Sequence, residues 1–148
     1  MSNLTEMIVA LDGMDDITAL GMVEKFGGDV EFYKIGLELF TRYGPRLVHE
    51  VHDHGKSVFL DVKYHDIPAT VAGAVSAAVD LGISLVNVHA SGGREMVEAA
   101  VKSRGSKHTR LIAVTVLTSR GGGGVADEAL GFEPPSDGLQ RSAAGHVE

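Results

Sequence analysis

The chain contains no cysteine, no long hydrophobic run and no excess of positive charge. Without cysteine, neither a disulfide framework nor a thiolate metal site can form, which suits a reducing cytoplasm. No segment reaches the roughly 20 apolar residues that a membrane-spanning helix needs, and the N-terminus lacks the basic region of a signal peptide. We therefore expect a cytoplasmic protein that does not associate with membranes.

The net charge of -7 at pH 7 argues against a nucleic-acid-binding protein, which needs a basic surface to meet the phosphate backbone. It does not exclude an anionic small molecule, because a few local cations can hold a phosphate inside an acidic protein. With 148 residues, 44% of them hydrophobic, the chain is long enough for one domain with a core.

Five apolar, strand-like runs begin about 25 residues apart, which is the length of one βα unit. They are continuous rather than alternating, as is typical of parallel strands that helices cover. Between them lie helical patterns at 15–28, 67–82 and 91–105, and in 36–55 a short helical turn before a second helix that starts at Pro45 and stops at Gly55. The runs are 7–12, 31–36, 57–63, 84–90 and 110–118.

A series of this kind forms either an open doubly wound sheet or a (β/α)8 barrel. An open sheet concentrates its chemistry beside a glycine-rich first turn, and the first turn here, LDGMDD, has no such fingerprint. A barrel gathers all its strand ends on one face, where its active sites lie. Polar residues at the ends of all five runs favour the barrel: Asp12, Lys34, Asp61 with Lys63, His89 and Thr118.

The predicted class is therefore α/β, of the (β/α)8 TIM-barrel family. A complete barrel usually needs about 250 residues, so we expect an incomplete one with about five parallel strands and four to five helices. Residues 1–119 would form the N-terminal portion of the barrel. Residues 120–148 contain no further apolar strand and are expected to form a Gly-rich loop and a helical tail.

The densest group of charges lies in FLDVKYHDIPATV, at 59–71. Residues i and i+2 of a strand point to the same side, so Asp61 and Lys63 should share the pocket side, with Asp66 following beyond the strand. At close range the lysine keeps the acids ionised and they keep it protonated. Such a fixed ammonium can donate a proton to an atom that becomes negative. A D-x-K-x-x-D pattern more often forms a cluster of surface ion pairs. Here the polar residues at the other strand ends favour an active site.

Together, MIVALD, FYKIG, FLDVKYHDIPATV, VNVHASGG and AVTVLTS resemble the orotidine 5'-phosphate decarboxylase family, over about residues 7–119. The D-x-K-x-x-D-I-P stretch is the specific part of the resemblance. It implies a homodimeric (β/α)8 barrel that converts orotidine 5'-phosphate to uridine monophosphate (UMP) in de novo pyrimidine biosynthesis, without a cofactor or a metal.

The resemblance also implies catalytic roles for three residues. Lys63 would protonate C6 of the pyrimidine as carbon dioxide leaves. Asp61 would lie against the substrate carboxylate, where like-charge repulsion disfavours the ground state. Asp66, with Ile67 and Thr70, would reach into the pocket of the partner subunit and contact the ribose end of the substrate.

For substrate binding, the resemblance places Asp12 and Lys34 at the ribose hydroxyls and Thr118 at the pyrimidine edge. The family holds the phosphate with an arginine and a glutamine on loops after the last strands. Gln140 and Arg141 are expected to precede the sixth strand, so they would not replace them. Since phosphate binding supplies remote energy for the reaction, turnover of this chain is expected to be reduced.

Two alternatives stay open. A sugar-phosphate decarboxylase or aldolase of the same superfamily would share D-x-K-x-x-D but bind magnesium, and Glu38 is the nearest acid for that. An inactive half-barrel could instead persist as an interaction module. The histidines at 49, 52 and 54 are more typical of a solvated helix face than of a metal site. His89 is expected to make a structural hydrogen bond rather than to take part in the chemistry.

Overall fold

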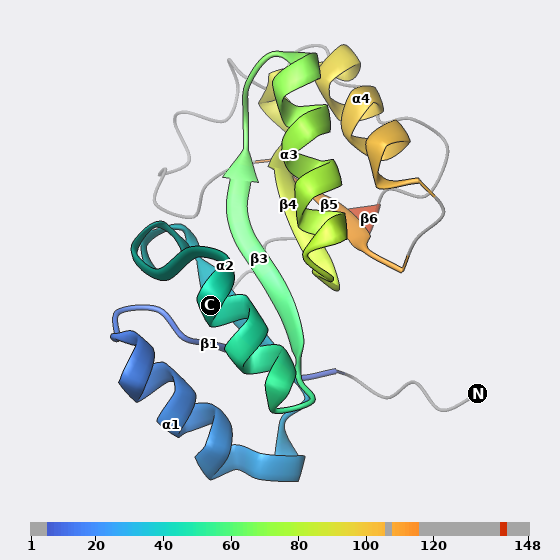
Figure 1. Ribbon diagram of the computed structural model, residues 1–148. Helices are drawn as coiled ribbons and strands as arrows, with labels where there is room; N and C mark the ends of the chain where they lie inside the picture. The colour runs from blue at the N-terminus through green and yellow to red at the C-terminus, as the bar shows by residue number, and fades with distance from the viewer. Residues whose placement is uncertain (1–5, 106–107, 116–139, 142–148) are drawn as a thin grey trace, which may run out of the picture.

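Strands and helices alternate along the chain, as the sequence predicts (Figure 1). The computed structural model describes residues 6–105, 108–115 and the backbone of 140–141. None of the helices in these ranges is long and apolar enough to cross a membrane. The elements are β1 (Ile8–Ala10), α1 (Asp16–Phe26), β2 (Phe32–Gly36), α2 (Leu37–Asp53), β3 (Ser57–Tyr64), α3 (Pro68–Asp80), β4 (Leu85–His89), α4 (Arg94–Arg104), β5 (Arg110–Val114) and β6 (Gln140–Arg141), with short 3-10 turns at Gly27–Asp29 and Ala90–Gly92.

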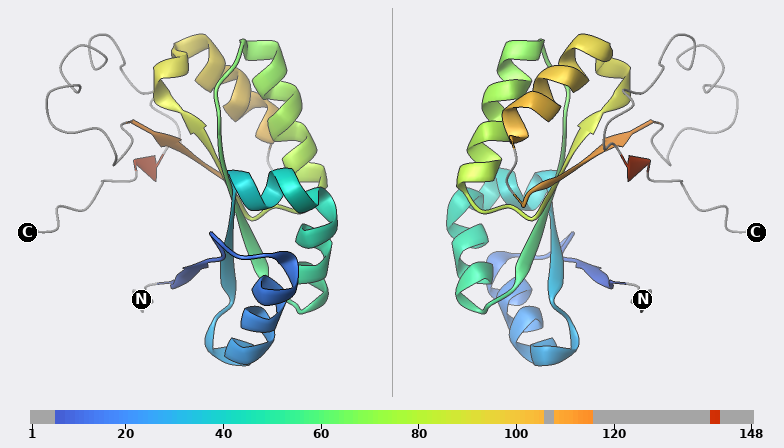
Figure 2. Two further views of the ribbon diagram at one scale, coloured as in Figure 1. Left: turned by 90° about the vertical axis from the view of Figure 1, so that its left-hand side faces the viewer. Right: turned by 90° about the vertical axis from the view of Figure 1, so that its right-hand side faces the viewer.

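The strands form one parallel sheet in the order β1-β2-β3-β4-β5-β6. A doubly wound sheet would reverse its order at a switch point, whereas here each described strand follows its predecessor in the same direction. Right-handed crossovers in one direction put every helix on the same face. Figure 2 shows the helices on one face of the sheet and the edge strands bending away from them. This is the arrangement of successive strands in a (β/α)8 barrel and confirms the predicted fold class.

The last strand differs from the prediction. Residues 140–141 were expected in a helical tail that precedes a sixth strand, but they form β6 themselves and pair in parallel with Ile112 and Ala113 of β5. Strand pairing at an open sheet edge is made by backbone groups and does not require an apolar run, so the composition of this segment gave no signal. The remainder of the expected loop and tail lies outside the described residues, and so does Thr118.

The hydrophobic core lies between the sheet and its helices. Side chains of successive strand residues point to opposite faces, and one set packs against the helices. This set includes Tyr33 and Ile35 of β2 and Val58 and Leu60 of β3, all of which are buried. Burial of this kind is worth about 25 cal/mol per Å² of apolar surface and supplies most of the driving force for folding.

The other set of side chains points to the inner face of the curved sheet. Residues in direct register share a face, and the register pairs Lys34 with Phe59 and Gly36 with Asp61. Along β2 and β3 this face therefore changes from aromatic at the beginning of the strands to charged at their ends. On these two strands the charged side chains of the inner face therefore lie toward the carboxyl ends.

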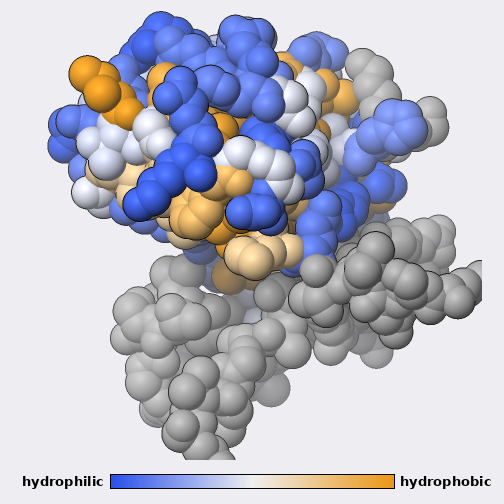
Figure 3. Space-filling model, turned by 90° about the horizontal axis from the view of Figure 1, so that it is seen from below, coloured by the Kyte–Doolittle hydropathy of each residue, from blue (hydrophilic) through white to orange (hydrophobic). Residues whose placement is uncertain are grey.

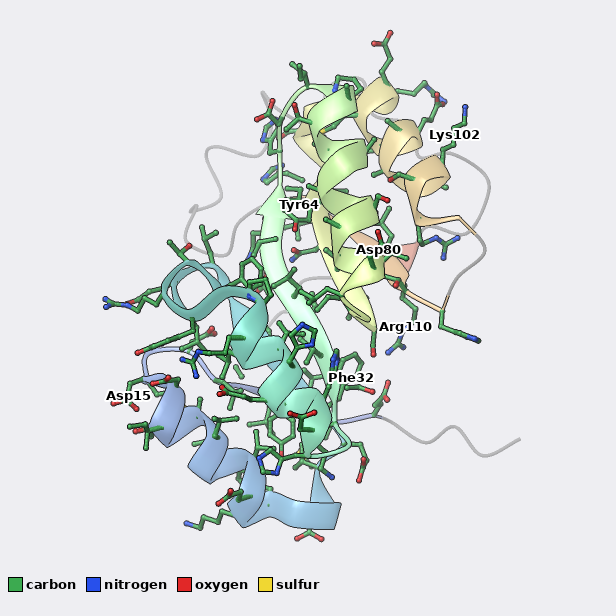
Figure 4. All side chains as sticks on the ribbon, viewed as in Figure 1. Asp15, Phe32, Tyr64, Asp80, Lys102 and Arg110 are labelled. Carbon is green, nitrogen blue, oxygen red and sulfur yellow. The ribbon has the colours of Figure 1, made fainter. Side chains whose placement is uncertain are left out.

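Arg110 connects strands that are not neighbours in the sheet. It lies on β5, yet its guanidinium carbon is 5.4 Å from the centre of the Phe32 ring on β2, and its Nη2 is 3.1 Å from Glu6 Oε2 (Figure 4). Because β3 and β4 separate β2 from β5, this contact requires a strongly curved sheet.

Seen from below, the described surface carries mainly hydrophilic residues with small hydrophobic groups between them (Figure 3).

Helix α2 is broken at Gly44, as the sequence predicts. Gly44 has φ 59° and ψ -149°, and Pro45 begins the second half of the helix. This backbone conformation is open to glycine and strained for residues with a Cβ. Proline fixes φ at a helical value and has no N–H to lose, so it suits the first turn of the second half.

Substitution of Gly44 by alanine should therefore lower the free energy of unfolding by about 1–3 kcal/mol. The control is Gly21→Ala: Gly21 is exposed in the middle of α1, and a Cβ there meets open space. That substitution should instead raise the free energy of unfolding by about 0.5–1 kcal/mol. Urea unfolding followed by circular dichroism measures both, and equal effects of the two substitutions would contradict the argument.

Candidate active site

Four charged side chains form a continuous array at the carboxyl ends of β1, β2 and β3. Lys34 Nζ lies 2.5 Å from Asp12 Oδ2 and 3.1 Å from Asp61 Oδ2. Lys63 Nζ lies 2.5 Å from Asp61 Oδ1. The charges therefore alternate in the order Asp12, Lys34, Asp61, Lys63, and the structure brings together the four residues that the sequence predicts at these strand ends.

The middle of the array is shielded from solvent and its ends are open. The side chains of Asp61 and Lys34 are 14% and 19% exposed, whereas those of Lys63 and Asp12 are 36% and 53% exposed. A charged group that is removed from water needs a close partner of opposite charge. Asp61 and Lys34 are such partners for each other. Of the two lysines in the array, Lys63 is therefore the one that is more accessible to a bound molecule.

The pKa values of the inner pair shift toward their charged forms. Burial opposes ionisation of Asp61, but the hydrogen bonds from Lys63, Asn87 and Lys34 outweigh it and lower the pKa of this carboxyl. Burial likewise opposes the charge on Lys34, and its hydrogen bonds with Asp12 and Asp61 outweigh it and raise the pKa of the ammonium. Both groups are therefore held charged at neutral pH.

Strand β3 is irregular where it carries the array. The register with β4 shifts between Leu60 and Tyr64, so that residues 61–63 face the single β4 residue Asn87. Within this bulge Lys63 has φ 51°, the one positive value among the described residues other than glycine. A bulge of this kind re-aims side chains and is enriched next to functional sites.

Asn87 is a site residue that the sequence reasoning missed. Its side chain is 1% exposed; Nδ2 donates to Asp61 Oδ1 at 2.6 Å, and Oδ1 accepts from the backbone N–H of Lys63 at 2.7 Å. The available signal was a single amide side chain inside the apolar run LVNVH, in which every other residue before the terminal histidine is apolar.

Gly36 was missed as well. A Cβ on Gly36 would collide with the carboxylate of Asp12 and would lie 3.5 Å from Lys34 Nζ. Its φ of -81° is open to any residue, so the requirement for glycine here is one of space. The absence of a side chain at this position lets Asp12 approach Lys34.

The remaining predicted residues lie at the beginning of α3 or outside the described part. Asp66 accepts a hydrogen bond from the backbone N–H of Ile67 at 2.6 Å. Ile67 precedes Pro68 and is 66% exposed, and Thr70 is exposed in the first turn of α3. Asp66, Ile67 and Thr70 thus form an exposed group directly after β3. Thr118 lies outside the described residues.

The histidines near the site have structural contacts. The rings of His65 and His89 stack at 5.2 Å between centroids, and Ser91 N donates to His89 Nδ1 at 3.3 Å. On α2, the pKa of His52 is lowered by burial and by the nearby His49. Within the described part of the chain, no group of three or more histidine, cysteine or acidic side chains is placed to hold a metal ion.

A cavity of about 440 Å³ lies on the opposite, helix-covered face of the sheet, between α2 and α3. Tyr64 and Asp80, both labelled in Figure 4, contribute to its lining, with Leu60 and Phe40. Burial raises the pKa of Tyr64. Because Leu60 points away from the inner face, this cavity is separate from the charged array.

The fold defines a protein of the (β/α)8-barrel class, and its charged array lies at the carboxyl ends of the strands, where barrels of this class carry their active sites. The chain belongs to the Orotidine 5'-phosphate decarboxylase / HUMPS family, whose model matches residues 5–145. It is 50% identical over 121 residues to an orotidine 5'-phosphate decarboxylase of Alcanivorax borkumensis, a match that covers 80% of this chain and 52% of that protein. It is 54% identical over 117 residues to one of Chromohalobacter salexigens, covering 78% and 50%.

Solved structures share the fold of this chain. An uncharacterized conserved protein from Geobacillus kaustophilus superposes with a TM-score of 0.75 at 40% identity, covering 86% of this chain and 62% of that one. Orotidine 5'-phosphate decarboxylase from Lactobacillus acidophilus superposes with a TM-score of 0.73 at 34% identity, covering 87% and 61%. The chain spans about half the length of the curated relatives it matches.

The lowered pKa of Asp61 makes the stability of the fold depend on pH. An unfolded aspartate titrates near pH 4, so the contribution of Asp61 is fully present above about pH 4 and is lost as the pH falls through its lower folded value. The free energy of unfolding of the wild type should exceed that of Asp61→Asn at pH 7, and the difference should shrink on acidification. Urea unfolding at a series of pH values measures it. A difference that stays constant down to pH 3 would contradict the prediction.

Proposed function

We propose that this site decarboxylates orotidine 5'-phosphate to UMP, a step of de novo pyrimidine biosynthesis, without a cofactor or a metal. The observation that carries the proposal is the Lys63 ammonium held 2.5 Å from Asp61 within an alternating charge array at the strand ends. The relatives that are about half identical to this chain are named for that reaction.

The array suits this chemistry because decarboxylation leaves an electron pair on carbon. When the bond from C6 of the pyrimidine to the carboxylate breaks, carbon dioxide departs and C6 becomes a carbanion. The ammonium of Lys63, whose side chain is 36% exposed, would donate the proton that completes the product. Asp61 would hold that ammonium in place and repel the carboxylate of the bound substrate, which disfavours the ground state relative to the transition state.

Lys34 and Asp12 would serve binding and positioning. Because the pKa of Lys34 is raised, this lysine stays protonated and acts as a fixed cation between Asp12 and Asp61. Asp12 is half exposed and would accept hydrogen bonds from the ribose hydroxyls. Thr118 would bind the pyrimidine edge.

A sugar-phosphate decarboxylase or aldolase is the alternative within the same family. Such an enzyme would need Glu38 or another acid to hold magnesium. Glu38 is instead paired with Arg42 on the exposed surface of α2, at 3.1 Å. A dependence of activity on magnesium would favour this alternative over the proposal.

We also propose a homodimer in the cytoplasm. Asp66, Ile67 and Thr70 would reach the site of the partner from the beginning of α3. Ile67 supports this arrangement, because an apolar side chain that is 66% exposed beside a charged site is suited to burial in a subunit interface.

Decarboxylation is tested by the loss of orotate absorbance when the protein is added to orotidine 5'-phosphate. Lys63→Ala should lower kcat by a factor of about 100 to 10,000, because it removes the proton donor. The control is Lys102→Ala, which removes an exposed lysine in the last turn of α4 and should leave activity unchanged. The proposal fails if the wild type shows no turnover, or if the Lys63 variant is as active as the wild type.

The dimer is tested by sedimentation velocity. Ile67→Lys should shift the protein from dimer to monomer, because it would bury a charge in the proposed interface. The matched control is Ile17→Lys on α1, where the isoleucine is 79% exposed and outside that interface. A wild-type protein that sediments as a monomer at micromolar concentration would rule the dimer out.

A further inference from the structure

We propose that Asn87 is a positioning residue that sets the geometry of the Asp61–Lys63 pair through both ends of its side-chain amide. The inference rests on the proposed function for its catalytic consequence. The placement itself stands on contacts within the described residues.

The first contact is with the carboxylate. Asn87 Nδ2 donates to Asp61 Oδ1 at 2.6 Å, the same oxygen that accepts the Lys63 ammonium, while Oδ2 faces Lys34. The carboxylate of Asp61 is thus held by a donor from its own strand, β3, and by one donor from each neighbouring strand, β2 and β4. With three donors around it, the plane of this carboxylate is fixed.

The second contact is with the backbone of the bulge. Because residues 61–63 face one residue of β4, the regular ladder is interrupted there. The N–H of Lys63 donates instead to Asn87 Oδ1, at 2.7 Å. A buried N–H without a partner is unfavourable, so this bond stabilises the bulge in which Lys63 adopts φ 51°. The side chain of Asn87 replaces the missing main-chain acceptor.

An amide is the side chain suited to both tasks. It offers a donor and an acceptor at once, whereas a carboxylate offers only acceptors. It is also neutral, so it leaves the balance of two acids and two lysines in the array unchanged. An aspartate at this position would place a third negative charge beside Asp61 and would remove its donor.

The test separates positioning from stability. Asn87→Leu keeps the approximate shape of the side chain and removes both hydrogen bonds, and Asn87→Ala serves as a second variant if the first does not fold. The control is Thr109→Val, which removes a buried hydrogen bond of 2.7 Å from Thr109 Oγ1 to Ile83 O, on the loop before β5. All three variants should lose stability, so stability alone does not distinguish them.

The distinguishing readout is NMR titration of the wild-type chain and its variants. In the Asn87 variants the pKa of the Asp61 carboxyl should rise, and the Lys63 side-chain resonances should move toward those of a mobile lysine. In Thr109→Val neither should change. A folded Asn87 variant in which the Asp61 pKa and the Lys63 resonances match the wild type would overturn the inference.

Kinetics supply the second readout. If the wild type decarboxylates orotidine 5'-phosphate, the Asn87 variants should lose about 100-fold in kcat, with a smaller change in KM, because the ammonium is misplaced. Equal kcat in the variant and the wild type would overturn the inference. If the wild type is inactive, the proposed function fails, while the titration still decides whether Asn87 positions the pair.

Discussion

The carboxylate of Asp61 is the group on which the site depends. A partly buried negative charge is stable only when donors surround it, and here Lys34, Lys63 and Asn87 contribute them from three strands. Each donor makes a different contact with the carboxylate: the Lys34 ammonium meets Oδ2, while the Lys63 ammonium and the Asn87 amide both donate to Oδ1. These partners keep Asp61 ionised although burial opposes it. The hydrogen bonds and ion pairs of Asp61 therefore connect three neighbouring strands at their carboxyl ends.

This arrangement requires a curved sheet of parallel strands. Parallel strands end on one side, and curvature brings those ends close enough for side chains to meet. At the beginning of the strands the inner face is filled by Phe32 and crossed by Arg110, which reaches from β5 to β2 and to Glu6. At their ends the same face carries charges. The contacts at the beginning of the strands are thus separate from the charged array at their ends.

The bulge in β3 shows how strain is placed at the site. A lysine with φ 51° is unfavourable in isolation, and such conformations persist where surrounding contacts hold them. Hydrogen bonds from the neighbouring strand supply those contacts. The space beside Gly36 has a comparable effect on Asp12, since a side chain there would displace the carboxylate that meets Lys34. Family membership is consistent with such a site, although the matched relatives are about twice as long as the matched region.

The sequence by itself determined the order of the first five strands and the helices between them, the break at Gly44–Pro45 and the polar residues at the strand ends, because hydrophobic periodicity and turn chemistry are local. Only the tertiary structure decided how these residues meet. The role of Asn87 depends on the register between β3 and β4, and that of Gly36 on the approach of Asp12 from β1. The pairing of β6 depends on an open edge that its own two polar residues do not reveal. Contacts between distant segments are set by packing and register, which no short stretch of sequence encodes.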